Sequence, residues 1–238
     1  MIRTLLIRGM LVGIFAGVLA FCFAHWLGEP EVDRAIAVEA SIDQSRGEAP
    51  EPMLVSRKTQ KGLGLFAGTV LYGVALGGIF GLVYAYAQGR YSVTDPRQLS
   101  VLIAGFGYGA IVIVPALKYP GNPPSVGNPE TIGLRTAAYF LLIALSIATL
   151  TASIQLHRWF ALRFGSWNGK LLSGALYLLL VAVLYRVFPS IDEVPSAFPA
   201  SLLWRFRIAS WELQAVLWVS LGVAFGWLTN RSRFSYGS

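Results

Sequence analysis

Long uncharged apolar segments recur along the chain and restrict its fold more than any other feature. Each is close to the roughly 20 residues that a helix needs to cross the hydrocarbon of a bilayer. Lipid offers the backbone no hydrogen-bond partners, so such segments must be helices or the strands of a closed barrel. Barrel strands alternate apolar and polar residues, and these segments do not alternate. The sequence therefore predicts an all-α fold, a polytopic transmembrane helical bundle.

The overall composition agrees with a membrane protein. Only 13% of the 238 residues are charged, whereas soluble domains carry about a quarter, and the mean hydropathy is +0.59. Arg3 and Arg8 precede the first apolar segment as in a signal peptide, but that segment runs to about Leu27 and exceeds the 7–15 residues of a cleavable signal. The lone Cys22 excludes an intrachain disulfide. We therefore predict a retained first span.

We expect about six spans within a single membrane domain covering 1–238. The first two spans are separated by a long outer loop, 28–61, whose residues 43–56 are typical of a solvated, partly disordered segment. The apolar residues 35–38 favour an ordered helix lying on the membrane over residues 25–39. In the last outer loop, residues 200–207 resemble a short interfacial helix, with aromatic rings at headgroup level and arginines in reach of phosphates. The expected spans are about 4–27, 62–87, 98–117, 134–156, 168–188 and 211–229.

Charge differs between the two sides that these spans define. With six spans both termini share one side, and both are basic, which favours the cytoplasm by the positive-inside rule. The other side carries a similar number of cations, five of them in the long first loop, and Arg57, Lys58 and Lys61 beside the second span favour the reverse orientation. With the termini in the cytoplasm, all of the 12 acidic residues except Asp95 fall on the outer side. Clustered carboxylates raise the local concentration of cations, so the outer side is suited to gathering them. The carboxylates of the first loop are Glu29, Glu31, Asp33, Glu39, Asp43, Glu48 and Glu51.

A histidine and two carboxylates at the outer end of the first span form the strongest candidate metal site. In a helix, the four-residue spacing places His25 and Glu29 on one face, and a bend at Pro30 would bring Asp33 back toward them. Imidazole and carboxylates suit Co, Ni, Zn, Mn or Fe. The alternative is an interfacial histidine beside solvated acids. Two further candidate ligands, Asp192 and Glu193, follow the fifth span in another outer loop.

The loop after the third span is rich in proline and glycine and cannot be helical. It is either a structural cap or the lining of a pathway buried in protein. Its end has the pattern of a helix start, with Asn128 as N-cap and Glu130 in the first turn. The candidate lining residues of this loop are Lys118, Asn122, Asn128 and Glu130.

Other patterns exclude several classes of protein. The sequence has no phosphate-binding G-x-x-x-x-G-K-[ST], no H-E-x-x-H and no G-x-S-x-G, so we expect neither ATP hydrolysis nor another enzymatic activity, and no covalently bound cofactor. We also expect no ionisable residue deep within a span, which argues against a self-contained proton antiporter.

Glycines at four-residue spacing predict close helix packing, within the chain or with a partner. They are Gly9, Gly13 and Gly17; Gly64 and Gly68; Gly73, Gly77 and Gly81; Gly105 and Gly109; Gly222 and Gly226.

Four segments resemble the CbtA family over most of the chain. They are Gly28 to Ala37 (GEPEVDRAIA), Ser56 to Gln60 (SRKTQ), Lys118 to Thr131, and Asp192 to Arg207. The family is described as the larger membrane subunit of a probable cobalt transporter. The resemblance implies a role in cobalt uptake that is linked to cobalamin synthesis. It places the chain in the bacterial cytoplasmic (inner) membrane. It also implies a small, single-span partner, CbtB, with a histidine-rich terminus. The family is usually described with five spans, whereas we expect six here.

Together these observations predict the membrane subunit of a divalent-metal uptake transporter, with cobalt as the transported cation that the resemblance implies. Its partner would supply the histidines that this chain lacks. The alternative is a structural or assembly subunit that docks partners and transports nothing.

Overall fold

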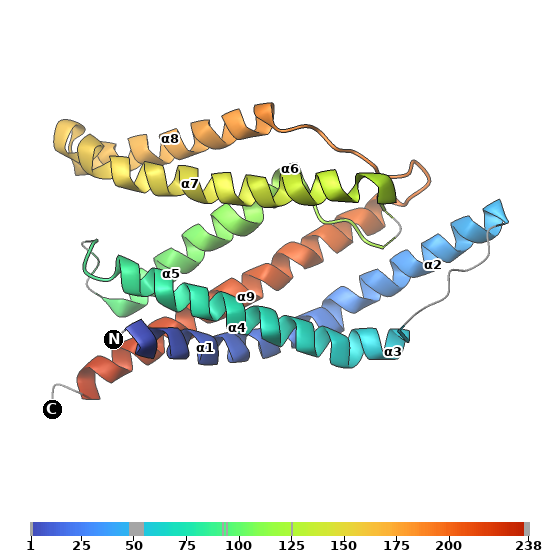
Figure 1. Cartoon of the computed structure of the whole chain (residues 1–238), viewed down its shortest axis with the longest axis horizontal. Coiled ribbons are helices and arrows are strands. Elements are labelled where there is room, and N and C mark those ends of the chain that lie inside the picture. Colours follow the sequence, from blue (N-terminus) through green and yellow to red (C-terminus); the bar gives the residue numbers. More distant parts are fainter. Residues whose placement is uncertain (1, 48–54, 92, 94, 125, 236–238) are drawn as a thin grey trace. The chain divides into compact units, whose positions relative to one another are not determined.

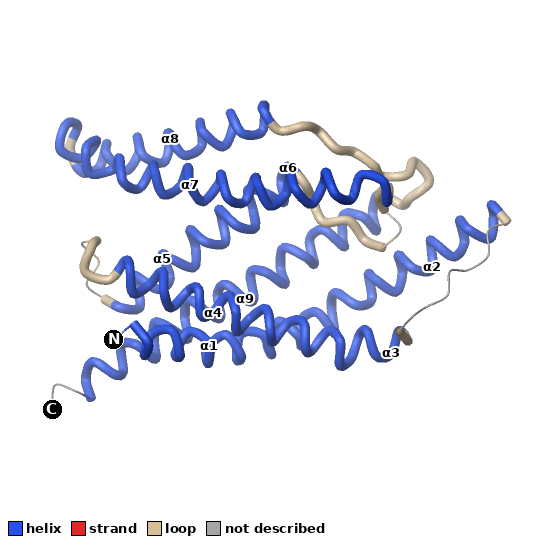
Figure 2. Tube along the Cα trace, viewed as in Figure 1, coloured by secondary structure: helices blue, strands red, loops and turns tan. Residues whose placement is uncertain are grey.

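A computed structural model of the chain describes residues 2–47, 55–91, 93, 95–124 and 126–235 (Figure 1). Within these residues the backbone forms helices, loops and turns, and no strand (Figure 2). Six helical segments are long and apolar enough to cross a membrane, which confirms the predicted helical bundle. They are Ile2–Ile42, Arg57–Ala87, Pro96–Lys118, Ile132–Phe164, Ser166–Val187 and Ala200–Arg231.

The helices cluster into two compact units. Unit 1 comprises Met1–Tyr108, Asn122–Ser125 and Phe198–Ser238, and unit 2 comprises Gly109–Gly121 and Val126–Ala197. A continuous helical run joins them, because α5 (Pro96–Gly107), the π-helix η3 (Tyr108–Ile113) and α6 (Val114–Lys118) follow one another without a break.

Unit 1 contains two long interrupted helices in addition to α5. Its remaining elements are α1 (Ile2–Phe23), the π-turn η1 (Ala24–Gly28) and α2 (Glu29–Arg46); α3 (Arg57–Thr59), the π-turn η2 (Gln60–Gly64) and α4 (Leu65–Ala87); and α9 (Ala200–Ser235).

Glycines set the contact between α1 and α4, which lie side by side in Figure 1. A Cβ atom at Gly9 would overlap the carbonyl oxygen of Gly77, and one at Gly13 would overlap that of Gly73. Gly17 meets Thr69 in the same way. The order of these pairs shows that the two helices are antiparallel and that their backbones touch, as small residues permit. The predicted packing of these glycines is therefore confirmed within the chain.

The contact between α5 and α9 combines small and aromatic residues. Gly226 meets the backbone of Arg97, and Gly107 meets the ring of Trp218, so these helices are also antiparallel. The buried hydroxyl of Ser100 donates to the carbonyl oxygen of Gly222 at 2.7 Å. Such an internal acceptor satisfies the hydroxyl where no water is present.

Unit 2 is a helical hairpin with a short stretch of loop against it. Its elements after α6 are the 3-10 turn η4 (Pro129–Thr131), α7 (Ile132–Phe164) and α8 (Ser166–Val187). Gly165 separates α7 from α8 at φ +84°, a left-handed conformation that favours glycine. The buried core of the hairpin consists of Ala138, Leu142 and Phe188.

Two expected boundaries differ from the structure. Residues 200–207 form the first turns of α9 rather than a separate interfacial helix, because no glycine or proline ends the helix after Arg207. The expected outer loop 28–61 is largely helical where it is described, since α2 continues the first span and α3 begins the second. Glu48 and Glu51 lie outside the described residues.

Candidate functional site

The histidine and carboxylates of the first span lie on one continuous helix. The expected bend at Pro30 is wrong, because the helix passes through it. A proline ring clashes with the carbonyl of the residue four positions before it, and the π-turn η1 widens the helix immediately upstream. Within that turn the backbone N–H of Glu29 donates to the carbonyl oxygen of Ala24, five residues back.

These residues meet the start of the second span. Nδ1 of His25 lies 3.0 Å from the carbonyl oxygen of Lys61. Arg57 donates through Nε to Asp33 at 2.9 Å and through Nη2 to Glu29. The ammonium of Lys61 lies 3.4 Å from the other oxygen of Asp33. The structure therefore gathers His25, Glu29 and Asp33 at one corner, with Arg57 and Lys61 opposite the two carboxylates.

Arg57 is the residue that sequence reasoning left out of this site. The sequence shows it only as a basic residue flanking the second span. Its pairing required knowing that α1 and α4 are antiparallel, which brings residue 57 beside residue 29. Over the described part of the chain, no group of three His, Cys, Asp or Glu side chains is arranged to hold a metal. The corner is thus a set of carboxylates neutralised by internal cations.

Glu193 of unit 2 closes the proline-rich loop onto the start of α7. Its carboxylate accepts the backbone N–H of Asn128 at 2.7 Å and the hydroxyl of Thr131, and it lies 3.4 Å from Nε of Arg135. The Thr131 hydroxyl, the Asn128 N–H and then the Arg135 charge hold the pKa of Glu193 below its ordinary value. Each stabilises the ionised form.

Asp192 lies in the same loop, where its Oδ1 accepts the backbone N–H of Val194 at 3.4 Å. It therefore caps a local turn. Both Asp192 and Glu193 belong to unit 2, whereas His25, Glu29 and Asp33 belong to unit 1.

The candidate lining residues have well-defined local contacts. The ammonium of Lys118 donates to the carbonyl oxygen of Tyr185 at 3.0 Å, and Oδ1 of Asn122 accepts from Arg207 at 3.0 Å. Oδ1 of Asn128 accepts the N–H of Glu130 at 2.9 Å, as predicted for an N-cap. Glu130 itself is exposed. These contacts organise the loop.

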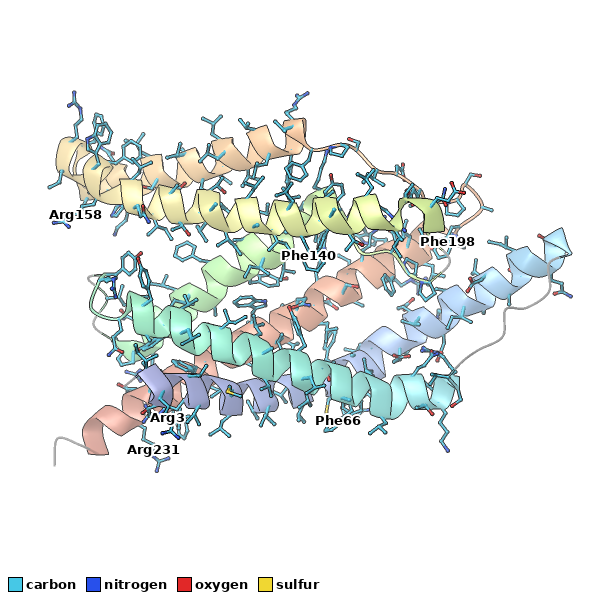
Figure 3. The ribbon with its side chains drawn as sticks, viewed as in Figure 1. Arg3, Phe66, Phe140, Arg158, Phe198 and Arg231 are labelled. Carbon is cyan, nitrogen blue, oxygen red and sulfur yellow. The ribbon has the colours of Figure 1, made fainter. Side chains whose placement is uncertain are left out.

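The carboxylates of each unit lie at one end of its helices, partly paired with basic residues, and further basic residues lie at the other end. In unit 1, Arg3 and Arg231 lie at one end of the long axis (Figure 3), and the pairing of Gly226 with Arg97 brings the start of α5 to that end. The carboxylates of α2 lie at the opposite end. In unit 2, Arg158, Arg163 and Lys170 flank the α7–α8 turn, while Glu130, Asp192 and Glu193 lie at the other end.

Glu212 is a second residue whose place the sequence did not reveal. It was expected near the outer boundary of a span beginning at 211. Because α9 begins at Ala200, Glu212 lies about 18 Å along the helix. Glu212 therefore lies within the candidate span Ala200–Arg231 rather than at its start. The continuous helical pattern from 200 onward is the signal that would have placed it.

Comparison with known proteins identifies the family. The family model described as "Probable cobalt transporter subunit (CbtA)" matches residues 2–230. No curated protein and no solved structure matches the chain. Since the match covers nearly the whole chain, including the charged corner, the proline-rich loop and α9, this chain belongs to the CbtA family of probable cobalt transporter subunits.

Proposed function

We propose that the chain is the membrane subunit through which a divalent cation, cobalt by the family description, enters the cell. It would act with a small, single-span, histidine-rich subunit like CbtB. We place it in the bacterial inner membrane with both termini in the cytoplasm, and we assign it no enzymatic activity. The observation that carries the proposal is the grouping of carboxylates at one end of each unit, where Arg57 and Lys61 pair with those of unit 1 and Arg135 with Glu193 of unit 2.

The charged corner of unit 1 supports a cation-exchange step at the entrance. Arg57 pairs with both Glu29 and Asp33, and Lys61 pairs with Asp33. A divalent cation that displaces the guanidinium of Arg57 would gain both carboxylates, with the imidazole of His25 beside them. Arg57 would then act as a resident counter-cation that keeps the corner ordered until the metal arrives. Carboxylate and imidazole ligands suit a first-row divalent metal.

The acidic residues of unit 2 support the same proposal in a different way. The carboxylate oxygens of Glu193 hold the loop closed, so we assign Glu193 a role in shaping the entrance rather than in binding the metal. Asp192 and Glu130 add negative charge at that end of the hairpin. Such charge raises the local cation concentration and the rate of capture, an effect that salt weakens.

Uptake of radioactive cobalt into proteoliposomes tests the proposal, with the chain present alone and together with its small partner. We expect flux that requires both subunits and falls in the His25→Ala/Glu29→Ala double variant. Glu39→Ala, which changes a carboxylate outside the corner, is the matched control. Equal flux for the double variant and the wild type would remove His25 and Glu29 from the mechanism.

A structural or assembly subunit is the second candidate function, and glycines that face open space favour it. A Cβ atom at Gly68, Gly105 or Gly109 would meet nothing within 4 Å, so these positions are open to a partner helix. A purified complex without bound cobalt or flux, but disrupted by Gly105→Leu, would support this function over transport.

A further inference from the structure

Residues on either side of Glu212 contact the middle of two other spans. Its neighbour Trp211 accepts a hydrogen bond at 3.1 Å from the hydroxyl of Tyr108, and the amide of Gln214 faces Tyr72 on α4. By helical rise, Tyr72 lies about 16 Å from Lys61 and about 22 Å from Ala87. Lys61 and Ala87 mark the two ends of the second span, and the hydrocarbon core of a bilayer is about 30 Å thick. The level of Tyr72 and Glu212 is therefore well inside it.

The carboxylate of Glu212 has little to compensate it at this depth. Its side chain is exposed, and no ion pair or hydrogen bond of the carboxylate is found among the described residues. On α9 its neighbours one turn away, Ile208 and Val216, are apolar. Along the α1 stretch that packs against α4, from Gly9 to Gly17, every residue is apolar. Carboxylates in such surroundings are costly and mark ion pathways more often than structural sites.

Oxygen atoms gather around this level. The hydroxyl of Tyr108 lies at the backbone of Trp211, the residue before Glu212, and Tyr108 begins the π-helix η3, a feature frequent at functional sites. The amide oxygen of Gln214 is buried without a hydrogen-bond partner among the described residues. A basic side chain on a partner helix, like a bound cation, would neutralise the charge of Glu212. The neighbouring hydroxyl favours a cation that takes several oxygen ligands.

We propose that Glu212, together with the hydroxyl of Tyr108, forms an oxygen-lined subsite for the transported divalent cation in the middle of the membrane. The assignment deepens the proposed function, on which it rests, by giving the cation a station between the two aqueous faces. It also places that station in unit 1, on the helix that follows the last outer loop.

A lipid-soluble carbodiimide tests the subsite directly. N,N′-dicyclohexylcarbodiimide reaches carboxyls from the hydrocarbon, and peptide mass spectrometry locates the adduct on the full chain in liposomes. We expect labelling of Glu212 that Co²⁺ reduces at least about twofold, with sodium at matched ionic strength giving no reduction. Tyr108→Phe should weaken the protection by Co²⁺, and Glu212→Gln should remove the adduct.

Three results would overturn the proposal. They are no adduct at Glu212, an adduct that Co²⁺ leaves unchanged, and protection that requires the partner subunit but not Co²⁺, which would assign Glu212 to a partner helix. Labelling is measured without flux, so it fails separately from the proposed function. Cobalt uptake without protection of Glu212 would overturn the subsite alone, and protection without any uptake would count against transport.

Discussion

The two units are stabilised in different ways. In unit 1, glycines bring the backbones of α1 and α4 into contact, and an ion-pair corner joins the start of α2 to α3. In unit 2, α7 and α8 pack through larger side chains, with Gly169 against Ala161 near the turn as a close backbone approach. Burial follows this difference. The apolar windows of the first two spans are 39% and 33% buried, whereas those of α7 and α8 are 17% and 6% buried.

This difference in packing determines which surfaces are left for other molecules. Membrane helices gain little from burying apolar surface, because lipid is as apolar as a leucine side chain. Unit 1 therefore depends on close backbone contact and on its polar groups. Unit 2 leaves long apolar faces for lipid or for another subunit. The polar groups with possible roles in transport, at the charged corner and around Glu212, belong to the more closely packed unit.

Breaking the glycine contact should have the largest effect. Gly77→Leu would force a side chain into the backbone of Gly9 and Gly13, and we expect a loss of about 3 kcal/mol of unfolding free energy. Gly68→Leu is the matched control on the same helix, since nothing lies within 4 Å of Gly68. Equal unfolding curves for the two variants in mixed micelles would refute the packing of α1 on α4.

Removing the cation of the charged corner should have the next largest effect. Arg57→Ala leaves Glu29 and Asp33 without their main partner, and the Arg57 side chain is only 22% exposed. We expect a loss of about 1–3 kcal/mol, as for hydrogen bonds to charged groups. Lys61 and Asp33 are 40% and 44% exposed in their pair, so Lys61→Ala should cost under about 1 kcal/mol. The order of the two losses is the test, again by unfolding in micelles.

A smaller effect in unit 2 would sharpen the comparison. Asn128→Ala removes the cap of the turn that leads into α7, and we expect a cost of about 1 kcal/mol. Hydrogen exchange should show faster opening at residues 129–135 and no change in α1 or α4. Faster exchange in both units would mean that the loop supports the whole chain.

The smallest effect we expect is a pH dependence of the same loop. Folding lowers the pKa of Glu193 from its ordinary 4.5, so its stabilising contribution is fully present above that value. It is lost as pH falls through the lower pKa of the folded state. The protection of the Asn128 and Thr131 amides, measured against their intrinsic exchange rates, should therefore fall as the pH falls below about 4.5. Glu193→Gln, which cannot ionise, should show a flatter pH profile, and an equal dependence in both proteins would contradict this role.

The sequence predicted the spans well, because apolar length and the absence of charge are local properties. It also predicted the cap at Asn128, which depends on neighbouring residues. The sequence does not reveal which distant elements pair, so it does not predict the contact of Arg57 with Glu29 and Asp33. Pro30 was misread because a π-turn upstream accommodates its ring. The sequence predicts a separate helix over residues 200–207 and a span beginning at 211, whereas α9 is continuous from Ala200 through Glu212.

The central claim is that the carboxylate-bearing ends of both units face the outside of the cell, where they gather the cation. Single cysteines at Glu39, Ser190 and Ser166 in a Cys22→Ala background test this by reaction with a membrane-impermeant maleimide on intact cells. We predict labelling at 39 and 190 from outside, and labelling at 166 only after permeabilisation. Labelling of 166 in intact cells, with 39 and 190 protected until permeabilisation, would contradict the account.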